Sequence, residues 1–455
     1  MQSIDKRAAL ALGHLLCFFA LLFASGDIWP VFNLGFTFRF AQLCILLSVA
    51  LLPAATGSGV RLFPGWYFLC LFVLWITVCL PFSLYLERSL GYVFWAIADV
   101  LAIFIFVQYF KTESALLKLI RFFLFCFTAV AAFGLLQFIL GVLGVDILIT
   151  QWWIPHRLPR INGLSYEPSY FSTYLLPGWV FSVYLLEKGA TTPRRVHLWI
   201  CAMTTTVALL LCSSRMGWLM ILLWLVSRMV AFLYRMGIRG TARWRTIIAG
   251  LLVPLVLAAG VGLATVSWRN LLDLVENVSF LTNGLGIAGG SSHSSEGRTS
   301  DFGTTWQAFL NYPITGTGIG AVPVDIASQH GSVVVSLESA KNYEGISVFV
   351  EILASTGLIG GALLAAFAVS VASKCIVKMH TFDTWRRLVL RSLCWSILWL
   401  LLVLQFNQNF LRIYVFLDLA VLICCLTAAA SSNCEMLGEA GSKPPKSGIV
   451  GVTTG

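Results

Sequence analysis

The chain has 455 residues, of which 58% are hydrophobic and only 11% are charged. Soluble domains carry about 25% charged residues, so this composition excludes an ordinary soluble protein and indicates a polytopic membrane protein. The net charge of +10 is explained by basic loops that face anionic membrane lipids, and it is no sign of nucleic-acid binding.

Runs of roughly 20 apolar residues recur along the whole chain, and each is long enough to cross a hydrocarbon core about 30 Å thick. The sequence therefore predicts an all-α polytopic membrane protein with about twelve transmembrane helices. The expected spans cover residues 8–25, 39–55, 64–83, 90–109, 119–143, 169–186, 196–212, 216–234, 246–266, 345–373, 392–407 and 410–429.

One long hydrophilic segment separates the ninth and tenth spans, and we expect it to form a large outer loop. The last residues are rich in Gly, Ser, Lys and Pro and are predicted to be disordered in the cytoplasm. The predicted divisions are spans one to nine (1–266), the large periplasmic loop (267–344), spans ten to twelve (345–430) and the tail (431–455).

The basic residues orient the chain. Of the 30 Lys and Arg, 21 fall on the side that holds both termini, which leaves nine on the other side. Because cytoplasmic loops are enriched in Lys and Arg, both termini are predicted to be cytoplasmic in a bacterial inner membrane. The nine outer bases are Arg39, Arg88, Arg157, Arg160, Arg215, Arg269, Arg298, Lys341 and Arg412.

The twelve cysteines all fall in spans or in cytoplasmic stretches. They show no metal-ligand spacing, and none lies in an outer loop where an oxidising environment would favour a bridge. The sequence therefore predicts neither a disulfide framework nor a metal site.

A polar break separates the fifth and sixth spans at residues 152–171. Pro155, Pro159 and Pro168 deny this stretch a continuous helix. Backbone without helical pairing survives at membrane depth only against protein or water, so we expect one wall of an active site on the outer face. Its candidate site residues are Arg157, Arg160, Tyr166, Glu167 and Ser169.

Two later outer segments also combine glycines with polar side chains. The turn 213–217 places Arg215 beside two serines and a glycine, which favours a polar cavity over simple headgroup contact. The glycines of 316–320 resemble a phosphate loop, but no strand–turn–helix unit surrounds them. A close backbone approach in a loop folded over the outer membrane face is the better interpretation.

Residues 298–310 lie within the predicted outer loop and carry the spacing of an amphipathic helix. The apolar positions are Phe302, Trp306, Phe309 and Leu310.

Eight of the nine outer bases are arginine, whose planar fork binds phosphate bidentately. We expect five of them to converge on a lipid-linked pyrophosphate: Arg157, Arg160, Arg215, Arg298 and Arg412. The alternative is that these arginines anchor separate loops. Glu167 and Glu344 are the candidate catalytic carboxylates, although Glu167 could instead pair with a neighbouring arginine. Tyr166, Ser169, Lys341 and Glu351 are supporting candidates.

These segments resemble the O-antigen polymerase and ligase superfamily of bacterial membrane glycosyltransferases. The resemblance rests on residues 160–171, 213–217, 298–320 and 347–360. It implies a GT-C-type fold and transfer of a glycan from an undecaprenyl-pyrophosphate carrier, without metal, nucleotide or other cofactor, in O-antigen or exopolysaccharide synthesis. The implied partners are lipid-linked glycans, membrane lipids and a chain-length regulator protein.

One departure from the family pattern separates its two activities. Ligases of the superfamily place a histidine where this chain has Ile346, followed by Ser347. Its absence favours a polymerase that joins repeat units over a ligase, and it leaves Glu344 or Glu167 as the activating base. A lipid-linked glycan flippase or another transporter is the alternative from a different class, as is an accessory protein without activity. Matching halves with broken helices, typical of transporters, are not evident.

Overall fold

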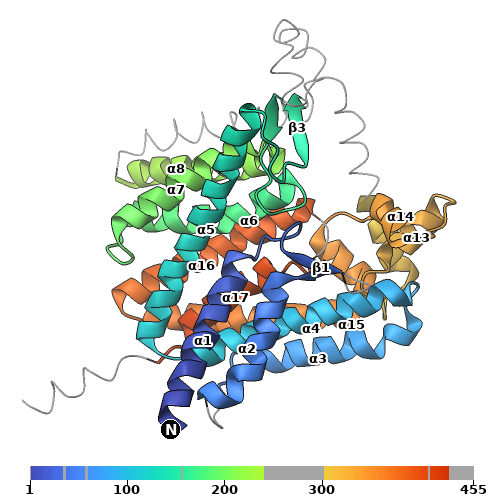
Figure 1. Cartoon of the computed structure of the whole chain (residues 1–455), viewed down its shortest axis with the longest axis horizontal. Helices are drawn as coiled ribbons and strands as arrows, with labels where there is room; N and C mark the ends of the chain where they lie inside the picture. Colours follow the sequence, from blue (N-terminus) through green and yellow to red (C-terminus); the bar gives the residue numbers. More distant parts are fainter. Residues whose placement is uncertain are drawn as a thin grey trace, which may run out of the picture.

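The structure is a computed structural model that describes residues 2–33, 37–56, 60–154, 157–239, 302–407 and 410–429. It is a bundle of helices with two small β-hairpins (Figure 1). The first half holds α1 (Gln2–Leu22), α2 (Phe40–Thr56), α3 (Trp66–Val78), α4 (Leu86–Tyr109), α5 (Glu113–Val142), α6 (Pro168–Glu187), α7 (Arg195–Leu211) and α8 (Arg215–Arg239). The second half holds a helix over 302–311, α13 (Val322–Gln329), α14 (Leu337–Ala340), α15 (Val348–Thr381), α16 (Thr384–Val403) and α17 (Ile413–Thr427). Three 3₁₀ turns are η1 (Leu80–Phe82), η2 (Lys341–Tyr343) and η3 (Leu404–Phe406).

A helix stands at eleven of the twelve predicted spans, and the ninth, 246–266, lies outside the described residues. Five of the described helices are long and apolar enough to cross a membrane, namely α4, α5, α8, α15 and α16 with η3. Four shorter apolar helices accompany them: α2, α3, α7 and α17. This architecture supports an integral membrane protein built of helices. The number of spans and the GT-C type stay predictions.

Two antiparallel hairpins add a β component that the all-α expectation lacked. Strand β1 (Val31–Asn33) pairs with β2 (Thr37–Arg39), and β3 (Gln151–Ile154) pairs with β4 (Leu158–Arg160). The second hairpin is part of the proline-interrupted stretch after α5. Prolines bias their neighbours toward extended backbone, and a two-stranded ribbon tolerates them because both of its strands are edges.

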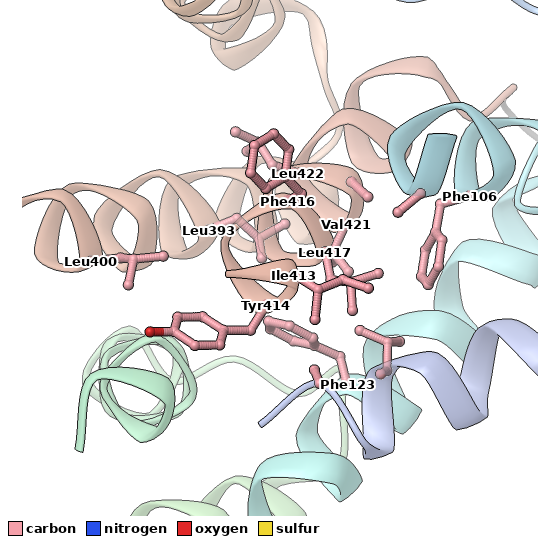
Figure 2. Close-up of a cluster of buried hydrophobic side chains, with 14 of the residues drawn as sticks. Phe106, Phe123, Leu393, Leu400, Ile413, Tyr414, Phe416, Leu417, Val421 and Leu422 are labelled. Carbon is pink, nitrogen blue, oxygen red and sulfur yellow. The ribbon is translucent and has the colours of Figure 1, made fainter. Parts of the chain in front are cut away.

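Helix α17 lies at the centre of the bundle (Figure 2). Leu417 and Val421 are fully buried, and Phe123 of α5 and Phe106 of α4 belong to the same buried cluster. An apolar helix that is buried on nearly all sides cannot shift without opening cavities. It therefore holds the residue that precedes it, Arg412, in a fixed position.

Basic residues gather at one end of the bundle, where they bind helix-terminal carbonyls. The Arg61 Nη1 donates to the Lys111 carbonyl over 3.0 Å and to the Thr427 carbonyl over 2.8 Å. Arg386 donates to carbonyls at the end of α17. Cations satisfy the acceptors that helix C-termini leave unpaired. Lys6 interacts electrostatically with Lys111, so bases assigned to one side of the membrane do meet at one end.

Helix α15 is interrupted at Gly357, whose φ of 66° and ψ of −174° are not helical. The backbone of residues 313–320 packs into this interruption, where the Leu358 N–H donates to the Pro313 carbonyl over 2.8 Å. A Cβ added at Gly316 would overlap the backbone of α15. The close approach predicted for these glycines is therefore confirmed.

The helix predicted in the outer segment is present and covers residues 302–311. Its buried side holds Thr305 and Ala308, both fully buried. Phe302, Trp306 and Leu310 are instead 47%, 41% and 50% exposed. Most of the apolar residues that defined the pattern thus face away from the protein.

Candidate active site

An ion pair joins the first turn of α4 to the residue after η2. The Arg88 Nη2 donates to the Glu344 Oε1 over 2.8 Å and to the Tyr92 hydroxyl over 2.9 Å. The Arg88 Nη1 is buried and has no hydrogen-bond partner among the described residues. Since a buried guanidinium donor without an acceptor is unfavourable, this nitrogen is suited to an anionic ligand.

A second buried group, here named the Asp27 cluster, comprises Asp27, Arg39 and Arg412. The Arg39 Nε donates to the Asp27 Oδ1 over 3.0 Å, and the Arg412 Nη1 donates to the Asp27 Oδ2. Arg39 lies over the Trp95 ring at 4.7 Å, and Arg412 lies over the Tyr170 ring at 3.7 Å. One carboxylate is shared between two arginines, so the Asp27 cluster carries an excess positive charge.

The Asp27 cluster also retains unused hydrogen-bond donors. The Arg39 Nη1 and the Arg412 Nε are buried without a partner in the described part of the chain. A buried cation normally finds its full set of acceptors. The Arg228 Nε and the Arg387 Nε are also buried without a partner among the described residues, so the orphaned donors of the Asp27 cluster point to an anion only together with its excess positive charge.

A third cationic group, the hairpin arginines, consists of Arg160 at the end of β4 and Arg215 at the start of α8. The Arg160 Nε donates to the Ser213 Oγ over 3.0 Å, and its Nη1 donates to the Gln151 Oε1 over 2.7 Å. Ser213 adopts a positive φ of 47° in the turn between α7 and α8. This turn brings two segments that are 53 residues apart into contact.

The two hairpin arginines repel each other electrostatically, and this repulsion affects the pKa of Arg160. Burial lowers the pKa of Arg160 from its ordinary value, and the charge of Arg215 lowers it further, whereas Cys212 and Glu167 act in the opposite direction. A guanidinium stays protonated at neutral pH because its ordinary pKa is above about 12. Two neighbouring cations that repel each other gain when a single anion lies between them.

Glu167 lies at the N-terminal boundary of α6 and interacts electrostatically with Arg160 and with Tyr170. Its Oε2 accepts a hydrogen bond from the Ser169 hydroxyl over 3.0 Å. It is half-buried and forms no ion pair within 4.0 Å with any described residue. This carboxylate therefore keeps acceptor positions for a substrate hydroxyl.

Tyr170, in the first turn of α6, connects the groups of the site. Its hydroxyl interacts electrostatically with Arg412, Glu167, Glu344 and Asp27. Arg412 also interacts with Glu344. The Lys341 Nζ lies 5.8 Å from the centre of the exposed Tyr166 ring. Charged residues from four separate segments thus interact with the Tyr170 ring.

The start of α15 completes the site. Ser347 has a positive φ of 68°, which is unusual for a residue with a side chain, and its Oγ donates to the Gln405 Oε1 over 3.2 Å. Such backbone persists only where its surroundings fix it, and it is concentrated at functional sites. The Ile346 N–H donates to the Thr305 Oγ1 over 3.3 Å. Glu351, one turn into α15, interacts electrostatically with Tyr92.

The structure brings most of the predicted site residues together. Arg160, Glu167, Ser169, Lys341, Glu344, Glu351 and Arg412 line one region, with Arg215 beside Arg160. Arg157 is exposed in the turn between β3 and β4. Arg298 lies outside the described residues.

The sequence did not identify Asp27 as a site residue. It also did not place Arg39 and Arg88 among the arginines expected to converge on a pyrophosphate. One signal was present: Asp27 is an isolated carboxylate directly after the first span, where an unpaired charge at the membrane boundary calls for a partner. Within the described ranges no group of three or more His, Cys, Asp or Glu is arranged to hold a metal ion.

The family model for O-antigen ligase matches residues 200–365. The chain is placed in the O-antigen ligase and polymerase superfamily. The matched range includes Arg215, Glu344 and the first part of α15 with its interruption at Gly357, so the superfamily segment carries one side of the site. A comparison with curated proteins finds no match.

Proposed function

We propose that this protein is a glycan polymerase of the inner membrane. It transfers an undecaprenyl-pyrophosphate-linked polysaccharide chain onto the next lipid-linked repeat unit at the outer membrane face. The superfamily match supports a membrane glycosyltransferase of the ligase or polymerase type. The observation that carries the proposal is the arginine-rich site around Tyr170, with its unused buried donors.

The buried arginines suit the donor's pyrophosphate. Arg39, Arg88 and Arg412 come from three separate elements, and each has one buried nitrogen without a partner among the described residues. As the glycosidic bond to the carrier breaks, negative charge builds on the leaving pyrophosphate. Preorganised donors in a dry site stabilise that charge far more than water does.

The hairpin arginines suit a second pyrophosphate. A polymerase holds two lipid-linked glycans at once, the growing chain and the next repeat unit, and each carries a pyrophosphate. Glu167 interacts electrostatically with Arg160, and Tyr170 interacts with Glu167 and with Arg412 and Asp27 of the Asp27 cluster. Two cationic groups around one carboxylate support polymerisation more directly than transfer to an uncharged acceptor.

In the reaction, a hydroxyl oxygen of the acceptor sugar forms a bond to the donor's anomeric carbon. The bond from that carbon to the pyrophosphate oxygen breaks, and the pyrophosphate leaves with the bonding electrons. The hydroxyl proton passes to a carboxylate. We assign this role to Glu167, because Glu344 is already bonded to Arg88 and an ion pair weakens a carboxylate as a base.

Reconstitution tests the proposal. The full-length protein in liposomes is given purified lipid-linked repeat units without nucleotide or added metal. A ladder of products that grows by one repeat unit at a time is expected. Single units that stay unchanged under all conditions would refute the polymerase assignment.

A ligase is the second candidate, and the observation in its favour is the description of the matched family as O-antigen ligase. The residue Ile346 at the position of the ligase histidine argues against it. Adding a lipid A core acceptor to the same liposomes distinguishes a ligase from a polymerase. Transfer of the glycan to the core without any ladder would identify a ligase.

A further inference from the structure

The helix over 302–311 exposes an apolar stripe on one side. Phe302, Trp306 and Leu310 follow at four-residue spacing and are 47%, 41% and 50% exposed. Ile314, just beyond the helix, is 63% exposed. Residues four apart lie on one face of a helix, and the exposed face of a water-surrounded helix is normally polar. This face is therefore fitted to an apolar environment.

The opposite side of the same helix is fixed to the protein. Ala308 belongs to a buried cluster with Val322 and Ile326 of α13 and Ala354 of α15. Thr305 accepts the hydrogen bond of the Ile346 N–H over 3.3 Å. The stripe thus sits on a helix that is anchored firmly and turned outward.

The depth of the helix follows from α15. Helix α15 consists of two helical segments joined by a kink at Gly357. The segment beyond the kink, residues 358–381, extends about 36 Å at 1.5 Å per residue and is alone long enough to cross a hydrocarbon core of about 30 Å. A span formed by this segment places the kink at one boundary of the hydrocarbon core.

The stripe is continuous with an exposed apolar surface of α15. Leu358 and Ile359, which follow the interruption, are 61% and 40% exposed. The Leu358 N–H donates to the carbonyl of Pro313, the residue before Ile314. Ile314 and the helix that precedes it thus join this exposed apolar surface of α15.

We propose that the helix over 302–311 lies in the outer interface of the bilayer, with Phe302, Trp306 and Leu310 inserted among the lipid chains beneath the headgroups. Tryptophan and other large apolar side chains are favoured at this depth. Bilayer lipid is the occupant of the stripe. Through Thr305 and Ile346, the insertion sets the height of the 344–347 segment above the membrane. The inference does not depend on which sugar transfer the protein performs.

Depth-dependent quenching tests this inference on the full-length protein in nanodiscs of phosphatidylethanolamine and phosphatidylglycerol. A fluorescent amino acid is placed at Trp306 or, as the matched control, at Gln307, an exposed neighbour that donates to Asn311. Lipids brominated on their acyl chains are expected to quench position 306 at least about twofold more than position 307. Aqueous iodide is expected to show the reverse order.

Two outcomes would overturn the inference. Equal quenching of both positions by iodide would mean that the stripe is in water. Protection of position 306 from both quenchers would mean that protein covers it.

A second test keeps the probe at position 306 and changes a different residue of the stripe. With the probe at 306, Phe302→Glu is expected to lower quenching by brominated lipid, because a charge resists insertion. Gln307→Glu should leave that quenching unchanged. An unchanged signal in Phe302→Glu, in protein that remains monodisperse, also counts against insertion.

Discussion

The Asp27 cluster and the hairpin arginines hold their cations in different ways. In the Asp27 cluster both guanidinium groups are buried, share one carboxylate and stack on aromatic rings. In the hairpin, Arg160 is half-buried and bound mainly by neutral groups, and Arg215 is exposed. The first arrangement is rigid and dehydrated, whereas the second is open to solvent.

The difference indicates that the two cationic groups bind different pyrophosphates. A dehydrated, preorganised site stabilises developing charge strongly, which suits the pyrophosphate that leaves. An open site binds and releases its ligand with less reorganisation, which suits the incoming repeat unit. Glu167 interacts with Arg160 of the hairpin arginines, and Tyr170 interacts with both Glu167 and the Asp27 cluster.

The largest effect is expected at the carboxylate of Glu167. Glu167→Gln keeps the shape and the acceptor for Ser169 but cannot take a proton, so polymer formation should fall by about 10²–10⁴-fold. The rate of ladder formation in liposomes measures this. Glu87→Gln, an exposed carboxylate in the first turn of α4, is the control and should remain active. Near-normal activity of Glu167→Gln would mean that another residue is the catalytic base.

Loss of a buried arginine should be the next largest effect. Arg88→Ala or Arg412→Ala removes a donor aimed at the leaving group and should lower turnover by about 10²–10³-fold. Lys374→Ala, an exposed cation on α15, should match the wild type. Turnover within about threefold of the control in both arginine variants would contradict the assignment of the leaving pyrophosphate.

The Asp27 cluster should also matter for stability. Asp27→Ala leaves two buried guanidinium groups without their shared carboxylate, and breaking a buried pair in this way costs about 3–5 kcal/mol. Thermal unfolding in detergent should show a lower midpoint. Added inorganic pyrophosphate should restore part of the loss if the cluster is an anion site. No stabilisation by pyrophosphate, in either variant or wild type, would argue for a purely structural cluster.

A graded effect is expected along the hairpin. Arg160→Ala removes a guanidinium with three hydrogen bonds and, like Arg215→Ala, should abolish long chains in cells while the protein still reaches the membrane. Arg157→Ala, at an exposed position, should shorten the chains less. Gel ladders of cell-surface glycan provide the readout. The same chain-length ladder in all three variants would mean that the hairpin arginines do not belong to the site.

Glu344→Gln should have the smallest effect. The amide still accepts the hydrogen bond of Arg88, so kcat/KM should fall by no more than about tenfold, mainly through a higher KM. A loss as large as that of Glu167→Gln would reassign the base to Glu344.

The sequence alone indicated a helical membrane protein and located the motifs between its apolar runs. Apolar runs of membrane length, prolines between spans and an excess of arginine on one side are local patterns. They predicted eleven of the described helices, an amphipathic helix at 298–310, which the structure shows over 302–311, and the close approach of Gly316. Each depends on residues that are neighbours in the chain, where spacing and chemistry can be read directly.

The tertiary structure decided which charges meet. Asp27 and Arg412 are 385 residues apart, and Arg88 and Glu344 are 256 apart. No local pattern encodes such pairs, because they arise from the packing of the helices that carry them. The same packing turned Trp306 outward: an amphipathic repeat gives two faces, and only the neighbouring α13 and α15 determine which one is buried.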